Sequence, residues 1–384
     1  MLVMRIAYYT DSISEHQIPV ALRLVEKYGQ DNFRYFYLND RAAHRRQMMG
    51  KDAVKYSWTR RISDAKDEFL EWTECADVLY TIFREPVLFE RRIAQGKLTF
   101  YMSERWFKPP IGMLRLVHLK YFQMAKRLVS CFESGLVYYF PTGVIAARDM
   151  VRLYSLLKKD WQSVFMARKL VYERFAGGTV QGYPWMKMWG YFVEAGQHLT
   201  MRKNRNNTLK VLWVGRFLKL KRVDTIIKAV KNTAGVELDI YGAGEQEEFL
   251  RGMSKKCSRI SIHGVIPLIE VRNQMRQHDV YVMASNGFDG WGAVVSEAIE
   301  EGMIVLGTYE CGAPATLLPE SNLFHVGDWR RLSSMLSTLQ INSCVDSQPQ
   351  YMSPKGWRAE DAAKAMVSMI ELHASLFRQM DSDI

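Results

Sequence analysis

Residues 284–302 read Ala-Ser-Asn-Gly-Phe-Asp-Gly-Trp-Gly-Ala-Val-Val-Ser-Glu-Ala-Ile-Glu-Glu-Gly, directly after the apolar run 279–283. The pattern predicts a buried strand, a turn through Gly290-Trp291-Gly292, and an apolar helix over 293–301. A helix that begins directly after such a turn has free backbone N–H groups in its first turn, where the helix dipole is positive. The segment therefore predicts a site for an anionic ligand such as a diphosphate.

Two carboxylates accompany this turn. Asp289 and Glu297 lie eight residues apart, one before and one after the glycines. Carboxylates repel phosphate, so they do not hold the diphosphate itself. They suit sugar or ribose hydroxyls, which donate hydrogen bonds. We interpret the segment as half of a nucleotide-sugar site, with Gly290, Trp291 and Gly292 beside the two acids.

Length and composition indicate a globular protein with two domains. The chain has 384 residues, of which 48% are hydrophobic and 24% charged, and this length is more than one core usually holds. Its five cysteines are scattered without a CxxC pair or zinc-like spacing, which predicts reduced thiols in a cytosolic setting. A signal-peptide pattern is not evident, and no apolar run approaches the ~18 residues of a spanning helix. We expect a cytoplasmic protein.

Nearly all of the net charge of +11 lies in one stretch, residues 101–205, which holds 17 Lys and Arg against 6 acids. Such a balance predicts a basic face for nucleic acid, anionic lipid headgroups or phosphorylated glycolipids, unless the lysines serve only solubility. Part of it mixes basic residues with Trp106, Phe107, Tyr121 and Phe122 around a helix. This mixture suits either the inner face of the cytoplasmic membrane or the packing of an ordinary amphipathic helix.

Strands and helices alternate through the first half. Apolar runs predict strands over 4–9, 33–38, 78–83, 98–102 and 136–140. Helical periodicity is present over 18–28, 64–74, 86–95, 113–129 and 145–157. Alternation of this kind predicts a mostly parallel, doubly wound α/β sheet. The aromatic-rich segment 184–192 suits either a cleft wall or simple packing, and the polar stretch 201–208 is the predicted linker.

The second half repeats the pattern more clearly. Strands are predicted over 209–214, 236–241, 260–263, 280–283 and 303–306. Helices are predicted over 222–231 and from residues 245, 268 and 293. The fold class is therefore α/β, with two Rossmann-like domains over 1–205 and 206–384 facing across a cleft. The terminal amphipathic helix, 359–380, is expected to return to the first domain.

Cations and glycines follow the first strands of the second half. Arg216 and Lys221 lie on the loop after strand 209–214, where two positive charges suit a departing diphosphate. Solvated surface bases are the alternative. Gly242 and Gly244 form a turn after the next strand, but the full GxGxxG fingerprint of dinucleotide enzymes is absent. This absence argues against a simple NAD enzyme.

These pieces follow one another in an order that resembles a known family. The segments that carry the resemblance are Gly215-Arg216, Lys221-Arg222-Val223-Asp224, Tyr241-Gly-Ala-Gly244, His263-Gly264-Val265, Asp279-Val280, Ala284-Ser285, Asp289-x7-Glu297-Ala298 and Gly302. Together they resemble the C-terminal domain of retaining family-four (group 1) glycosyltransferases of the GT-B fold. The resemblance covers roughly 209–340, and the first half resembles the acceptor domain of that family only loosely.

The resemblance implies roles for the paired acids and cations. Glu297 would bind the ribose hydroxyls and Asp289 the donor sugar ring. Arg216 and Lys221 would hold the diphosphate, so that no metal and no further cofactor is needed. The backbone near His263 and Val265 would face the base.

This chain departs from the family pattern in three places. The first acid of the pair is usually Glu, whereas Asp289 is one methylene shorter. The loop after the first strand, 10–17, has no glycine pair. Many members have a His where this chain has Ser103-Glu104-Arg105-Trp106. His16, Glu104 and Arg105 are therefore candidates to contact the sugar from the first domain, against a helix-terminal role for His16 and a local salt bridge for the other two.

The sequence as a whole predicts transfer of a sugar from a nucleoside-diphosphate donor to a hydroxyl of a glycan or lipid-linked glycan. The resemblance implies retention of anomeric configuration and a place in surface polysaccharide synthesis. A nucleotide-sugar epimerase or a phosphorylase of the same fold is one alternative. A non-catalytic binding protein for nucleic acid or glycan, acting through 101–205, is another, although nucleic acid is not our expected partner.

Overall fold

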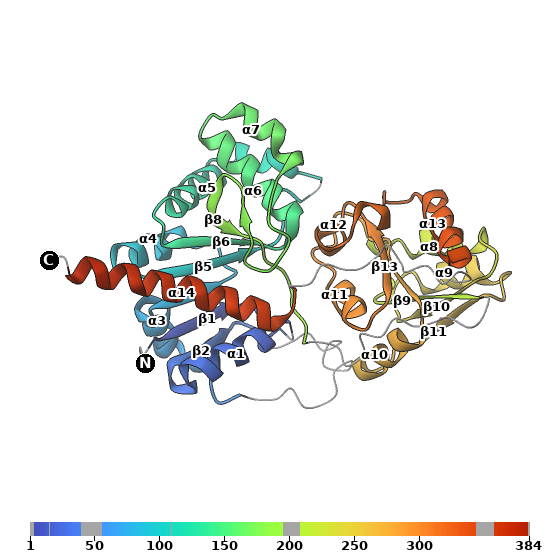
Figure 1. Cartoon of the computed structure of the whole chain (residues 1–384), viewed down its shortest axis with the longest axis horizontal. Coiled ribbons are helices and arrows are strands. Elements are labelled where there is room, and N and C mark those ends of the chain that lie inside the picture. The colour runs from blue at the N-terminus through green and yellow to red at the C-terminus, as the bar shows by residue number, and fades with distance from the viewer. Residues whose placement is uncertain are drawn as a thin grey trace. The chain divides into compact units, whose positions relative to one another are not determined.

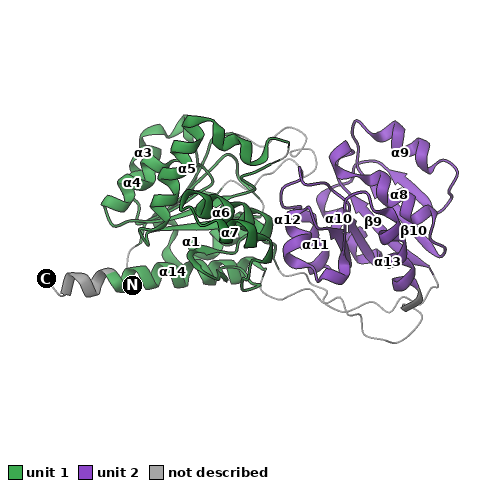
Figure 2. Cartoon of the chain, turned by 90° about the horizontal axis from the view of Figure 1, so that it is seen from above, with its two compact units in different colours: residues 1–42, 54–194, 355–384 green, residues 43–53, 195–354 purple. Residues whose placement is uncertain are grey.

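Two mostly parallel sheets organise the chain in the computed structural model, which describes residues 4–14, 16–39, 56–108, 110–194, 208–342 and 357–382. Each sheet forms the centre of one compact unit (Figure 2). Unit 1 comprises residues 1–42, 54–194 and 355–384, and unit 2 residues 43–53 and 195–354. Residues 201–207 of the predicted linker 201–208, and the predicted boundary between 205 and 206, lie outside the described residues.

Unit 1 contains eight strands in the order β3-β2-β1-β4-β5-β6-β8-β7, parallel except for the β7–β8 pair. The strands are β1 Ile6–Thr10, β2 Phe33–Tyr37, β3 Thr59–Arg61, β4 Val78–Thr81, β5 Leu98–Ser103, β6 Val137–Pro141, β7 Thr179–Val180 and β8 Tyr183–Lys187. The central strands β1, β4 and β5 are buried along their whole length, which is why they read as continuous apolar runs. The order of the first six strands reverses between β1 and β4.

Helices connect these strands (Figure 1). They are α1 Ile18–Tyr28, α3 Lys66–Cys75, α4 Pro86–Ala94, α5 Leu119–Phe132, α6 Gly143–Leu157 and α7 Trp161–Met166. The helix predicted over 113–129 is wrong in its first turns. Residues Gly112–Val117 form a 3₁₀ segment, η3, and the extended backbone of His118 separates this segment from α5. Both α1 and α4 begin with a proline in their first turn, which suits the fixed φ of that residue.

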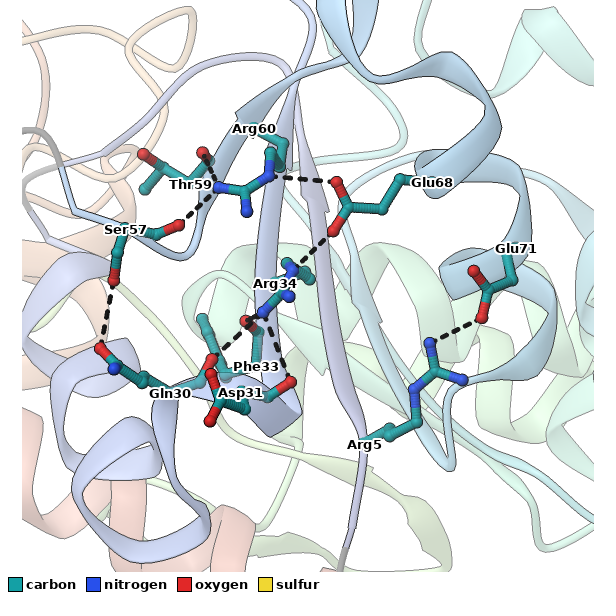
Figure 3. A network of polar contacts seen from close by, with 10 residues as sticks. All are labelled: Arg5, Gln30, Asp31, Phe33, Arg34, Ser57, Thr59, Arg60, Glu68 and Glu71. Atoms are coloured by element: carbon teal, nitrogen blue, oxygen red, sulfur yellow. Dashed lines mark hydrogen bonds and ion pairs between the residues drawn. The ribbon is translucent and has the colours of Figure 1, made fainter.

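Ion pairs attach the unpredicted edge strand β3 to the rest of unit 1 (Figure 3). Glu68 on α3 accepts hydrogen bonds from Arg34 Nε on β2 at 2.6 Å and from Arg60 Nε on β3 at 3.1 Å. Partial burial acts to raise the pKa of Glu68, but the two guanidinium groups outweigh it and lower the pKa. One carboxylate therefore joins two neighbouring strands to a helix.

The aromatic-rich segment 184–192 packs in the core of unit 1. Trp185 on β8 stacks on Phe132 at 4.6 Å between ring centroids, and Trp189 stacks on Phe140 at 4.3 Å. Trp189 and Phe192 are fully buried. Within the described part of unit 1, packing thus accounts for these rings.

The C-terminal helix α14, Ala359–Ser382, belongs to unit 1, as expected from the sequence. It lies along α1 (Figure 1), where Lys27 pairs with Glu371 at 2.5 Å. Its buried face reaches the sheet, because the Tyr8 hydroxyl on β1 donates to Met366 Sδ at 3.4 Å. Met366 and Ile370 are fully buried there.

Unit 2 repeats the same strand order in a six-stranded parallel sheet, β11-β10-β9-β12-β13-β14. The strands are β9 Leu209–Val214, β10 Val236–Tyr241, β11 Ile260–His263, β12 Val280–Met283, β13 Ile304–Thr308 and β14 Leu323–Phe324. The helices are α8 Val223–Lys231, α9 Glu247–Ser254, α10 Leu268–Gln277, α11 Ala293–Glu300, α12 Gly312–Leu317 and α13 Trp329–Asn342. Its order reverses between β9 and β12, so a ligand is expected at the carboxyl ends of these two strands.

Candidate functional site

The two loops that leave β9 and β12 meet at the reversal of strand order in unit 2. Lys221 ends a 3₁₀ turn, Lys219–Lys221, after β9, and its Nζ lies 2.5 Å from Asp289 Oδ2 on the loop after β12. The backbone N–H of Asn286 donates to Leu220 O at 2.9 Å and holds the same two loops together. The side chains of Lys221 and Asp289 are 22% and 16% exposed, so this ion pair is shielded but open to solvent on one side.

Glu297 lies in the same part of the site. It is 8% exposed on α11, the helix that begins after the glycine turn. Burial raises the pKa of Tyr281 on β12 well above its ordinary value, and the charges of Asp289 and Glu297 raise it further. Both charges therefore act on the same phenol, although eight residues separate them in sequence. Glu297 is carried by α11, the helix that follows the loop of Asp289.

Close packing fixes the loop that carries Asp289. Gly292 precedes α11 with φ +88°, and a Cβ there would lie 2.2 Å from Met283 Cε, so only glycine fits. Trp291 is buried beneath the turn. From α12, the N–H of Gly312 donates to Gly290 O at 3.1 Å and that of Ala313 to Trp291 O at 2.8 Å. The sequence prediction missed this support, although Cys311-Gly-Ala-Pro314, shortly after β13, contains a turn signal.

Gly242 and Gly244 hold the loop that carries Arg216. A Cβ on Gly242 would lie 1.9 Å from Gly215 O, and one on Gly244 would lie 2.9 Å from the backbone of Phe217. Phe217 N donates to Ala243 O at 2.9 Å. These glycines let two strand-end loops approach each other, and α9 begins only at Glu247. Arg216 itself is exposed and forms no ion pair within the described residues.

His263 lies at the carboxyl end of β11 with its side chain already engaged. Its ring stacks on Tyr241 at 4.4 Å between centroids, and Nε2 lies 2.6 Å from Asp239 Oδ1. The other oxygen of Asp239 lies 3.0 Å from His278 Nε2. The contact with His278 lowers the pKa of Asp239, and that with His263 adds to the effect against partial burial. Val265, two residues after His263, is 55% exposed. The backbone of this segment stays a candidate to face the base of the nucleotide.

The first-domain candidates have partners within unit 1. Glu104 pairs with Lys108 at 2.8 Å, which is the local salt bridge that was the alternative interpretation. Arg105 lies 3.4 Å from Asp149 on α6. Burial raises the pKa of Asp149, and Arg105 opposes this effect, so Arg105 compensates a buried acid. The ring of His16 lies 5.8 Å from that of Tyr191. Contact with a sugar stays a prediction for all three.

An open cavity of about 430 Å³ adjoins the Lys221–Asp289 pair. Its walls are residues of the strand-end loops of unit 2, namely Leu218, Lys219, Leu220, Arg222, Glu245 and Asn286. Ligand sites for small molecules commonly have volumes of ~300–1,000 Å³. Arg222 adopts the left-handed conformation with φ +50° and holds Asp224 by two hydrogen bonds of 3.0 and 3.1 Å. Glu245 and Asn286 were missed by the sequence prediction because each is a lone polar residue in a loop.

The chain is a two-domain α/β protein of the Rossmann-like type. Its two sheets are mostly parallel and share one strand order, and the sheet of unit 2 has an acid–cation pair where that order reverses. The sequence family of glycosyl transferases group 1 matches residues 200–353. This match confirms the predicted resemblance and identifies unit 2 as a group 1 glycosyltransferase domain. No curated protein sequence matches the chain significantly.

Solved structures show the same fold for the whole chain. A lipopolysaccharide outer core galactosyltransferase, WaaB, aligns with a TM-score of 0.60 at 15% identity, covering 96% of this chain and 99% of that one. The Anabaena protein Alr3699/HepE in complex with UDP aligns with a TM-score of 0.58 at 11% identity, covering 99% and 100%. WaaG, a glycosyltransferase involved in lipopolysaccharide biosynthesis, gives 0.53 at 14% identity, covering 97% and 99%. These neighbours confirm the GT-B fold, while the cleft expected between the two domains stays a prediction.

Proposed function

We propose that the protein transfers a sugar from a nucleoside-diphosphate-sugar donor to a hydroxyl of a glycan or lipid-linked glycan, with retention at the anomeric carbon. The observation that carries the proposal is the Lys221–Asp289 ion pair at the strand-order reversal of unit 2, followed by the buried Glu297 on α11. The acids accept hydrogen bonds from the donor's hydroxyls. Lys221 and the exposed Arg216 compensate the charge that the diphosphate gains as the glycosidic bond breaks.

Retention, the donor and the acceptor rest on the group 1 family. HepE binds UDP in its crystal structure, and the lipopolysaccharide enzymes among the neighbours support an acceptor in surface polysaccharide synthesis. Product analysis tests the proposal, since an epimerase would change the donor without any acceptor and a phosphorylase would need free phosphate. Detection of a glycosylated acceptor whose new linkage keeps the donor's anomeric configuration is the expected result.

Replacing Glu297 by glutamine is expected to weaken nucleoside-diphosphate binding by about 2–3 kcal/mol, because a charge-assisted pair of hydrogen bonds to the ribose is lost. A nucleotide that binds only the folded protein raises its melting temperature. Thermal-shift titration with UDP, GDP and dTDP therefore finds the nucleotide, and calorimetry gives its Kd. The exposed Glu248→Gln on α9 serves as the matched control. Equal affinity in E297Q and wild type would remove Glu297 from the site.

An anionic membrane is the proposed location of a lipid-linked acceptor, and burial argues against two of the residues predicted to insert into it. Trp106 and Phe107 are 0% and 5% exposed, so they are unsuited to insertion. Instead, α7 presents Trp161 and Phe165 at 58% and 78% exposure, and the exposed bases Arg168 and Lys169 follow. Apolar rings beside cations suit the interface of an anionic bilayer. None of the described helices has the length and apolar character to cross a bilayer.

The double substitution of Trp161 and Phe165 by serine is expected to reduce binding to anionic vesicles about tenfold or more, because burial of one large apolar side chain contributes ~1.5–3 kcal/mol. Flotation of the protein with phosphatidylglycerol vesicles measures the effect. Binding should also fall as salt is raised, since the Debye length shrinks to ~3 Å at 1 M. Phe249→Ser, at a phenylalanine of unit 2 that is 54% exposed, is the control. Unchanged flotation of the α7 variant would exclude this surface.

A further inference from the structure

Arg84 in unit 1 occupies the place that corresponds to the Lys221–Asp289 pair in unit 2. It follows β4, the strand beside β1 where the order of the unit 1 sheet reverses. The backbone N–H of Ile82, at the start of the same loop, donates to Tyr9 O on β1 at 3.3 Å. The carboxyl ends of parallel strands at such a reversal are where doubly wound sheets bind ligands. Arg84 therefore lies at the predicted ligand-binding edge of its sheet.

Aromatic residues hold the guanidinium of Arg84 in one orientation. Its Nε donates to the hydroxyl of Tyr101 at 3.1 Å, and Nη1 donates to that of Tyr121 at 3.4 Å. Its Cζ lies 4.2 Å from the ring centroid of Trp106. Stacking of this kind favours the cation and limits its rotation. The guanidinium of Arg84 is thus preorganised in one orientation.

No carboxylate balances this charge among the described residues. A guanidinium has five N–H donors, and two of those of Arg84 are used by the tyrosines. Arg92 is a useful contrast, since it also has no acid but is fully buried and donates to five backbone carbonyls and to Thr99. Its cation is satisfied by the protein. Arg84 is half-buried, and three of its N–H donors are not used by the tyrosines. Its partly desolvated charge would therefore be stabilised by a bound anion.

We propose that Arg84 binds a phosphoryl group of the acceptor. The planar fork of an arginine matches phosphate oxygens with two parallel hydrogen bonds. The Tyr121 hydroxyl, whose oxygen accepts from Nη1, has its own proton left to donate to the same ligand. The neighbouring cations Arg105 and Lys108 are already paired with Asp149 and Glu104. Arg105 and Lys108 therefore add to the positive potential around Arg84, but Arg84 remains the cation that binds the ligand.

The identification of the ligand as the acceptor rests on the proposed function, whereas the anion site at Arg84 does not. The glycosyltransferase proposal places the donor diphosphate in unit 2, so a second anion site in unit 1 belongs to the other substrate. The shared chemistry is a phosphate monoester or diester. It has two sources, a phosphorylated sugar and the headgroup of a lipid carrier.

Nuclear magnetic resonance of arginine Nε–H groups tests the site directly in the full chain. The Arg84 signal is assigned as the one lost in R84Q, and R84K removes the same signal if R84Q fails to fold. Titration of the wild type with inorganic phosphate is expected to shift this signal saturably, with a Kd on the order of 1 mM. The Nε–H of Arg127, which pairs with Glu90 on the surface, is the internal control, and sodium chloride at equal ionic strength corrects for salt.

Two further titrations distinguish the sources. Glucose 6-phosphate represents a phosphorylated sugar, and dihexanoyl phosphatidic acid represents a lipid headgroup, with glucose as the uncharged control. The ligand that binds at least about threefold more tightly than inorganic phosphate indicates the source. A shift of the Arg84 signal no larger than that caused by chloride overturns the inference. Melting curves with UDP on the wild type and on R84Q keep the two ideas apart, because a UDP-induced shift that persists in R84Q reports on the donor site.

Discussion

Replacing Lys221 by methionine is expected to lower kcat about 10²–10³-fold, the range observed when one preorganised charge-stabilising donor is removed from an active site. Two effects act together. The departing diphosphate loses a cation that matters most in the transition state. Asp289, 16% exposed and 2.5 Å from Lys221, also loses its partner and is left as an uncompensated carboxylate beside the donor. The measurement is steady-state transfer with the donor identified by thermal shift.

A double-mutant cycle with Asp289→Asn distinguishes a cooperating pair from two independent contacts. If the two side chains act as a unit, the double variant is no slower than the worse single variant. Lys228→Met is the matched control, since this lysine lies on α8 with 49% exposure and pairs only with Asp224. Activity of K221M within about threefold of the wild type would contradict the proposed role and make the ion pair merely structural.

Replacing Arg92 by methionine is expected to destabilise unit 1 by about 3–5 kcal/mol, the cost of breaking a buried charged network. Burial lowers the pKa of Arg92 to about 10, so the side chain remains a cation at neutral pH. It donates to the backbone carbonyls of Thr73, Ala76 and Leu98 at 2.9, 3.0 and 2.7 Å. These carbonyls would be left without partners in a site that water does not reach.

Hydrogen exchange followed by mass spectrometry measures this effect in the correct unit. Because the chain has two units, a single melting curve does not report on unit 1 alone. Amides of β4 and β5 should exchange about 10²–10³-fold faster in R92M, while those of β9 and β10 should not change. Arg91→Met is the control, since the adjacent arginine is 56% exposed and forms a surface ion pair with Glu74. Equal exchange in R92M and wild type would refute the structural role.

Buried parallel strands were the most predictable part of the fold. The bounds of β9, β10, β11 and β12 agree with the predicted ranges. β12 is buried along its whole length, whereas β10 alternates buried and more exposed residues, and both patterns are typical of a strand. The ion pair of Lys221 with Asp289 was predictable in position for a related reason. Each of the two follows a strand at one edge of the sheet, and that edge gathers the loops wherever they occur in sequence.

Other features depend on partners that are distant in sequence. The strand β3 has three residues, and its ion pair with Glu68 is indicated by no local pattern. The ion pair of Arg105 with Asp149 joins residues 44 apart, so the sequence did not indicate it either. The close approach of Gly242 and Gly244 to the backbone of the loop after β9 likewise depends on residues distant in sequence. Periodicity reports burial, but it does not report which residue satisfies a charge.

The position of α14 has a consequence for how the protein is made. Unit 1 contains β1 near the start of the chain and also the helix at its end, where Met366 meets Tyr8 across 358 residues. During synthesis on the ribosome, the sheet of unit 1 emerges first but lacks this covering helix until residues 359–382 have also emerged. All the strands of unit 2 emerge in the interval. Unit 2 can therefore reach its native state before α14 packs on the sheet of unit 1. A chaperone that binds nascent apolar surface would be expected to protect the face of unit 1 that α14 later covers.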